Sequence, residues 1–156
     1  MILLSVGWSI KAQEPKPTPN PSQASGGGAV AAEPAFRMIR SVSGTKLIEG
    51  GVRFGVEDPR TVFYAPADKE IIIYFTWEGL PGPHHFEGLW KNPSGKVVMT
   101  SEFDYKPPQS RFGGYFKMFP GETPVTGVWT LDARIDGETA GSHTFQITIA
   151  PRPDDI

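Results

Sequence analysis

Short segments in which apolar and polar residues alternate, separated by glycine and proline, dominate this chain from Phe36 onward. The clearest pair is Val128–Ile135 and His143–Ile149, with the dipeptide Asp136-Gly137 after the first of them. Alternation places every second side chain on one face of a strand, and an Asp-Gly pair favours the tight turn of a β-hairpin. Sustained helical periodicity occurs in no segment. We therefore expect an all-β fold.

Further strands are predicted at intervals of roughly ten residues. They are Phe36–Val42, Gly51–Val56, Thr61–Tyr64, Glu70–Glu78, His84–Lys91, Lys96–Phe103 and Phe112–Phe119. The segment Glu70–Glu78 is apolar on both faces, which is typical of a central strand. The tetrapeptide Asn92-Pro-Ser-Gly95 suits a type I turn. These candidate segments favour an antiparallel β-sandwich of seven or eight strands without a helix, with a small closed barrel as the alternative.

The N-terminal segment resembles a signal peptide. An apolar run, Met1–Ile10, precedes Lys11-Ala12, and cleavage is expected after Ala12. The run is short and no basic residue precedes it, which a start codon assigned too far downstream would explain. We expect residues 1–12 to be a truncated signal peptide of a bacterial periplasmic or secreted protein. The alternative is a disordered or core-docked N-terminus.

The rest of the chain divides by composition. Residues 13–35 carry alternating prolines and then Gly26–Gly28, so we expect a disordered linker. We expect residues 36–151 to form the β-sandwich domain and residues 152–156 to form a disordered tail. A chain of 156 residues suits one such domain. The apolar N-terminal run is shorter than the ~20 residues that span a bilayer, so no membrane span is expected.

Two motifs carry a family resemblance. They are Phe86-Glu-Gly-Leu-Trp90-Lys-Asn-Pro93-Ser-Gly95 and Gly127-Val-Trp129-Thr-Leu-Asp-Ala-Arg-Ile-Asp136-Gly137, the second followed by Phe145-Gln-Ile147. Together they resemble the hairpins of bacterial extracytoplasmic immunoglobulin-like or fibronectin-like β-sandwich domains, over residues 60–149. The resemblance implies an immunoglobulin-like sandwich with Trp90 and Trp129 in its core. It also implies an accessory role, because such domains are often attached to secreted enzymes or surface proteins.

The amino-acid composition and the motifs limit which functional sites this chain can form. The chain contains no cysteine, which excludes disulfides, thiolate zinc sites and a cysteine nucleophile. The net charge is −2 and no long run of like charges occurs, so we expect no nucleic-acid partner. No serine lies in a Gly-x-Ser-x-Gly elbow. We therefore expect no catalytic residues and no enzymatic activity.

The sequence His84-His85-x-Glu87 is the one cluster with metal-ligand residue types. On a strand, His85 and Glu87 would project from one face and His84 from the other. A third ligand would have to come from a distant residue, His143 or Asp104. Zinc requires three or four ligands in fixed geometry. We therefore expect no metal site and no cofactor, and His85 and Glu87 are the candidate ligands if a metal binds.

Aromatic residues are in surplus around a proline-containing loop. Tyr105 precedes the loop Lys106–Arg111, and Phe112, Tyr115, Phe116 and Phe119 follow it. We expect a binding surface there that consists of Tyr105, Lys106, Arg111, Phe112 and Tyr115. The alternative is that Phe112 and Phe116 fill the core while Tyr105 covers its open end.

These patterns favour a non-catalytic, exported accessory or protein-interaction domain, whose partner is a protein or a covalently neighbouring module. The first alternative is a carbohydrate-binding module that uses exposed aromatic residues. The second is a secreted enzyme or a metal-binding protein.

Overall fold

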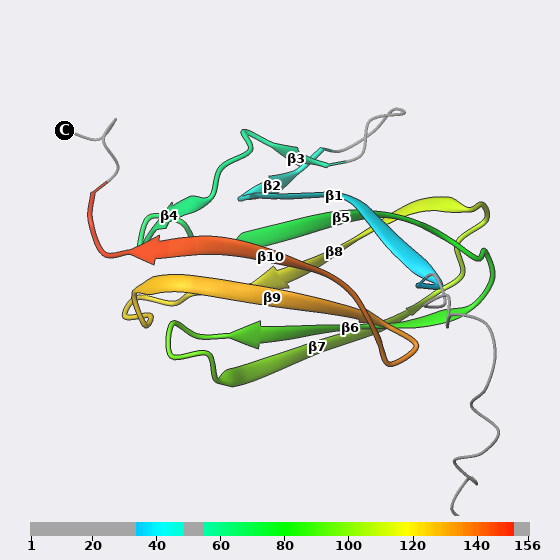
Figure 1. Ribbon diagram of the computed structural model, residues 1–156. Helices are drawn as coiled ribbons and strands as arrows, with labels where there is room; N and C mark the ends of the chain where they lie inside the picture. The colour runs from blue at the N-terminus through cyan, green and yellow to red at the C-terminus, as the bar shows by residue number, and fades with distance from the viewer. Residues whose placement is uncertain (1–33, 49–54, 152–156) are drawn as a thin grey trace, which may run out of the picture. The chain divides into compact units, whose positions relative to one another are not determined.

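The computed structural model describes residues 34–48 and 55–151. Within these ranges the chain forms ten strands and no helix, so the expected all-β class is confirmed. Two larger sheets pack face to face, and a two-stranded sheet lies beside them (Figure 1). No helix in the described ranges is both long and apolar enough to cross a membrane.

The described strands form three sheets. The three-stranded sheet has the order β1 (Phe36–Gly44), β5 (Ile71–Gly79), β8 (Arg111–Met118). The five-stranded sheet has the order β4 (Val62–Tyr64), β10 (Glu138–Thr148), β9 (Gly127–Ile135), β6 (His84–Lys91), β7 (Val97–Tyr105). The small sheet pairs β2 (Lys46–Leu47) with β3 (Val56–Glu57). Neighbouring strands are antiparallel, except that β4 runs parallel to β10.

The alternation of side chains along β5 explains which of its residues form the main core. On β5, the residues Ile71, Ile73, Phe75 and Trp77 face the five-stranded sheet in the main core. Ile72 and Tyr74 project from the other face and pack with Val56 in a second, smaller cluster. This strand lies between β1 and β8, as its two apolar faces predict.

The predicted burial of Trp90 and Trp129 is confirmed. Each buried indole N–H has a hydrogen-bond acceptor, as buried polar groups require. Trp90 Nε1 donates to Ser101 Oγ at 2.9 Å, and Trp129 Nε1 donates to the Val125 carbonyl at 2.8 Å.

Several expected boundaries differ from the structure. The predicted strand Lys96–Phe103 extends further than expected: β7 continues through Tyr105, because Asp104 and Tyr105 pair with β6. The last strand begins at Glu138, earlier than predicted, and its pairing with β9 has an irregularity between Thr139 and Gly141. The expected signal peptide, most of the linker, the C-terminal tail and residues 51–54 lie outside the described residues.

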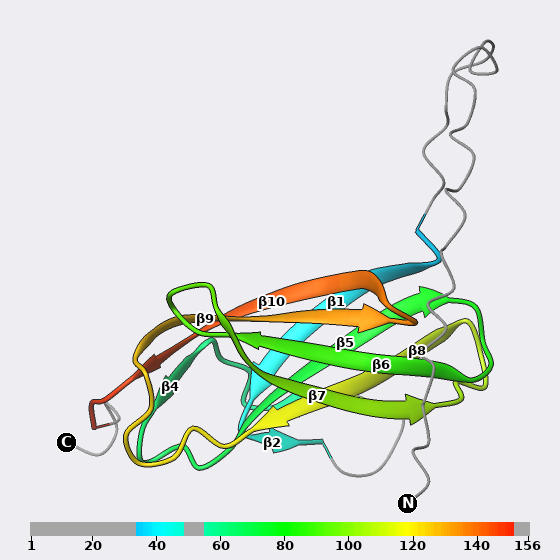
Figure 2. The same cartoon turned by 90° about the horizontal axis from the view of Figure 1, so that it is seen from below.

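Strands β7 and β8 are the outer strands of the two larger sheets, one in each. They run along the same side of the domain (Figure 2), and residues of both line one depression. This open side therefore exposes backbone edges and side chains from both layers.

Candidate functional site

A groove of about 560 Å³ lies between β7 and β8. Its lining includes Tyr74, Phe103, Tyr105, Tyr115 and Lys117. Both Tyr105 and Tyr115 are partly exposed, at 40% and 44%. The groove is therefore largely aromatic, with polar groups at its margin.

The register of β7 explains the aromatic wall. Phe103 lies opposite Phe86 of β6, and their rings stack with centroids 4.9 Å apart and planes 3° apart. Tyr105 lies two residues further along the same face of β7, and its ring centroid is 6.2 Å from that of Phe86. The row of core aromatic residues thus extends out to the open edge.

A pair of glycines on β8 brings the rings close to the backbone. A Cβ atom at Gly113 would lie 1.9 Å from the hydroxyl of Tyr74, so this ring can pack only against a residue without a side chain. A Cβ atom at Gly114 would lie 3.3 Å from the ring of Phe103. Burial raises the pKa of Tyr74, and the neighbouring Tyr105 adds to the shift. The Tyr74 hydroxyl therefore stays protonated.

The five predicted binding residues do not share one depression, although Tyr105 lines three neighbouring ones. Tyr105 and Tyr115 come together in the groove. Lys106 lines a neighbouring depression beside the histidines, and Arg111 lines another one, where its Nη2 is 3.9 Å from Glu78 Oε1.

The expectation of an exposed ring at Phe112 is wrong. Its side chain is 5% exposed and belongs to the main core. Alternate residues of β8 face inward, and Phe112 shares the inner face with Phe116. It packs edge-on against Phe36 and Phe86, at centroid distances of 6.2 and 6.0 Å. The alternative assignment to the core is the correct one for both phenylalanines.

The two adjacent histidines lie on opposite faces of β6, as alternation predicts. His84 is held by Asp136, with 2.6 Å between Nδ1 and Oδ2, and by the Leu80 carbonyl, 2.7 Å from Nε2. His85 projects from the other face of the strand, where Glu87 also lies. The Asp136 carboxylate accepts the backbone N–H of His85, which lowers the pKa of Asp136, and its contact with the His84 ring lowers it further.

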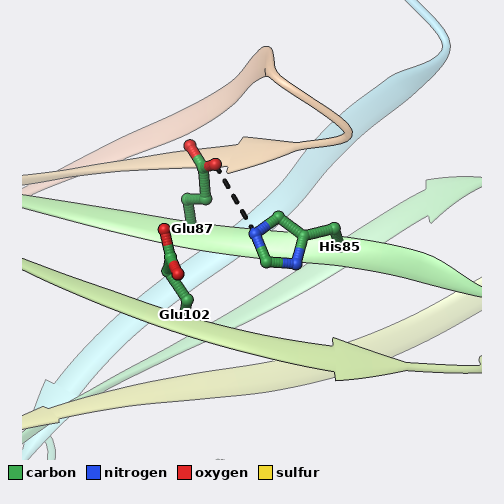
Figure 3. Close-up of side chains that lie close together, drawn as sticks. All are labelled: His85, Glu87 and Glu102. Atoms are coloured by element: carbon green, nitrogen blue, oxygen red, sulfur yellow. Dashed lines mark ion pairs between the residues drawn. The ribbon is translucent and has the colours of Figure 1, made fainter. Parts of the chain in front are cut away.

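Three carboxylates surround His85. Its Nδ1 lies 2.8 Å from Asp104 Oδ1, and its Nε2 lies 3.5 Å from Glu87 Oε1. Glu102 completes the group from β7: one ligand atom from each of His85, Glu87 and Glu102 lies within 4.8 Å of the others (Figure 3). The hydrogen bond to Asp104 raises the pKa of His85, and the charges of the carboxylates raise it further.

Glu102 is not among the candidate ligands predicted from the sequence. Of the two distant residues proposed as a third ligand, Asp104 contacts His85 directly. His143 lies elsewhere, where its two ring nitrogens are each 2.8 Å from the hydroxyls of Ser41 and Ser43. The turn at Asn92–Gly95 predicts the hairpin of β6 and β7, but the register that places Glu102 beside His85 depends on an irregularity between Trp90 and Lys91 that the sequence does not reveal.

Of the comparisons with known proteins, the one with solved structures gives matches. No protein-family model matches the chain, and no curated protein matches it. Among solved structures, the chain is similar to the Pseudomonas fluorescens alkylpurine DNA glycosylase AlkC bound to DNA containing an abasic site analog. The sequence identity is 12% and the TM-score is 0.48, over 74% of this chain and 31% of the glycosylase chain. The chain thus spans less than a third of that protein.

This match contradicts two expectations from the sequence, because the similar protein is an enzyme and is bound to DNA. We therefore withdraw the expectations that the chain lacks enzymatic activity and has no nucleic-acid partner. With a TM-score of 0.48, the likeness carries no argument for a particular activity or partner of this chain.

Proposed function

We propose that this chain is an exported immunoglobulin-like β-sandwich module and that the groove between β7 and β8 binds a carbohydrate. The apolar run Met1–Ile10 supports export. The strand order supports the immunoglobulin-like topology. Strands β1, β5 and β8 occupy the places of A, B and E in one sheet, and β6, β7, β9 and β10 those of C, C′, F and G in the other.

The observation that carries the carbohydrate proposal is the presence of two partly exposed tyrosine rings, Tyr105 and Tyr115, in the lining of one groove. A sugar ring has an apolar face of C–H groups that packs on an aromatic ring, while its edge carries hydroxyls. Tyrosine offers both a flat apolar ring and a polar hydroxyl. A volume of about 560 Å³ falls in the range of small-molecule sites, roughly 300–1,000 Å³.

Polar groups at the margin suit the hydroxyls of a sugar. Ser101, Asp104 and Lys117 all line the groove and provide hydrogen-bond donors and acceptors. Lys117 Nζ is 2.8 Å from Glu70 Oε1, and this hydrogen bond raises the lysine pKa, so the ammonium group remains charged. A charged donor forms stronger hydrogen bonds with a neutral acceptor than an uncharged donor does.

Calorimetric titration with a panel of oligosaccharides tests this function. Tyr105→Ala and Tyr115→Ala are each expected to weaken binding at least about tenfold, which equals ~1.4 kcal/mol. Phe119→Ala is the matched control, because this ring is 69% exposed and is not part of the groove lining. Failure of the whole panel to bind, or unchanged affinity in both folded tyrosine variants, would reject the proposal. The expected protein partner stays a prediction.

A further inference from the structure

We propose that His85, Glu87 and Glu102 bind one divalent transition-metal ion of the zinc class. This site lies on the outer face of the five-stranded sheet (Figure 3) and goes beyond the carbohydrate groove. An imidazole with two carboxylates is a ligand set that suits zinc and manganese, whereas calcium and magnesium prefer oxygen ligands alone.

The distances place the three ligands around a common point. Ligand atoms about 2.1 Å from a tetrahedral ion are about 3.4 Å apart, since tetrahedral angles set that separation. The three ligand atoms here lie within 4.8 Å of one another, and the pair from His85 and Glu87 is already at 3.5 Å. Rotation of the glutamate side chains, each with several rotatable bonds, closes the remaining gap. A fourth position is left for water or for a bound ligand.

The orientation of His85 provides a second argument. With the Nδ1 proton donated to Asp104 Oδ1, at 2.8 Å, the lone pair of Nε2 is directed toward Glu87. Histidines that bind metals commonly donate their other N–H to a carboxylate in this manner, which holds the ring and increases its basicity. Asp104 would therefore act as a positioning residue rather than as a ligand.

Charge provides a third argument. Glu87 and Glu102 are direct cross-strand neighbours on β6 and β7, and like charges in such positions repel each other. Arg134 of β9 lies opposite Glu87 on its other side, but in the described part of the chain no ion pair joins it to either glutamate. A divalent cation would offset this repulsion. A proton on His85 is the competing source of positive charge.

The test is a calorimetric titration of the tag-free chain with zinc chloride, because a histidine tag would bind the same ion. We expect one ion per chain. Glu102→Gln, which keeps the shape of the side chain, should weaken binding at least about tenfold, and Asp104→Asn should weaken it about tenfold. Glu138→Gln is the matched control, because this exposed glutamate lies at the start of β10, outside the cluster, and should leave the affinity unchanged.

Nuclear magnetic resonance locates the ion independently of affinity. The chain contains three histidines, so their ring signals can be assigned individually. Manganese chloride at substoichiometric amounts should broaden the signals of His85 most strongly and leave those of His143 sharp. The proposal is overturned if neither zinc nor manganese shows saturable binding up to about 1 mM. Binding that is unchanged in the folded variants His85→Ala and Glu102→Gln would overturn it equally. Neither result bears on the oligosaccharide titration of the groove.

Discussion

Replacing Trp129 with alanine tests whether β9 faces the core in the register described. The side chain is 6% exposed and stacks on Phe145 of β10, with ring centroids 6.5 Å apart and planes 19° apart. Removing a buried tryptophan side chain costs about 3–5 kcal/mol, from lost burial and the cavity left behind. The hydrogen bond to the Val125 carbonyl is lost as well, and such a bond contributes about 0.5–1.5 kcal/mol net.

This loss is a large share of the stability of a small domain, which is about 5–15 kcal/mol. The melting temperature, followed by circular dichroism, should fall by roughly 10–20 °C, and the urea midpoint should fall in parallel. Trp129→Phe should keep most of the packing and lose only about 1 kcal/mol.

Val128→Ala is the matched control for this experiment. Val128 is the preceding residue on β9, projects from the opposite face and is exposed. Truncating it should shift the free energy of unfolding by no more than about 0.5 kcal/mol. The inward assignment of Trp129 is refuted if Trp129→Ala melts within a few degrees of the unmodified protein, or if the control is the more damaging of the two.

Two further predictions concern the groove and the buried histidine. Gly113→Ala should displace the Tyr74 ring and lower the free energy of unfolding by about 1–3 kcal/mol, because its Cβ atom would lie 1.9 Å from the Tyr74 hydroxyl. In a double-mutant cycle with Tyr74→Ala the two losses should be less than additive, and strict additivity would show that the ring does not pack there. Burial lowers the pKa of His143, so the unfolded chain binds this proton more tightly than the folded chain does. The contribution of His143 to the free energy of unfolding should be fully present above the unfolded-state pKa of about 6.5 and should decline as the pH falls below it. In urea titrations at several pH values, His143→Gln should make this decline less steep. An unchanged pH dependence in this variant would contradict the lowered pKa of His143.

The features that the sequence predicts well are local ones. The two apolar faces of Glu70–Glu78 indicate a central strand, and β5 does lie between two neighbours. Alternation also places His84 and His85 on opposite faces of β6, where the structure has them. Each of these inferences needs only the period of two along a single strand.

Features that depend on distant pairing could not be predicted in this way. The parallel pairing of β4 with β10 joins segments that are far apart in the chain. The groove depends on Gly113, and a glycine within a strand does not reveal which ring will pack against it. Phe112 and Tyr115 are both aromatic residues of β8, yet one is buried and the other exposed, because they project from opposite faces. An aromatic surplus alone does not distinguish them.

The cluster of His85, Glu87 and Glu102 depends on one extra residue in the hairpin of β6 and β7. Asn92 N–H bonds the Lys96 carbonyl across the turn, and Lys91 pairs with Val97. Regular pairing from there would place Glu87 opposite Ser101, and Glu102 would project from the other face of the sheet. An irregularity between Trp90 and Lys91 inserts one residue into β7, so Glu87 faces Glu102 instead. A one-residue shift exchanges the two faces of a strand, which sends Phe103 and Tyr105 to the groove and Glu102 to His85. The aromatic wall and the proposed metal ligands therefore depend on the same bulge, which alternation along either strand alone does not reveal.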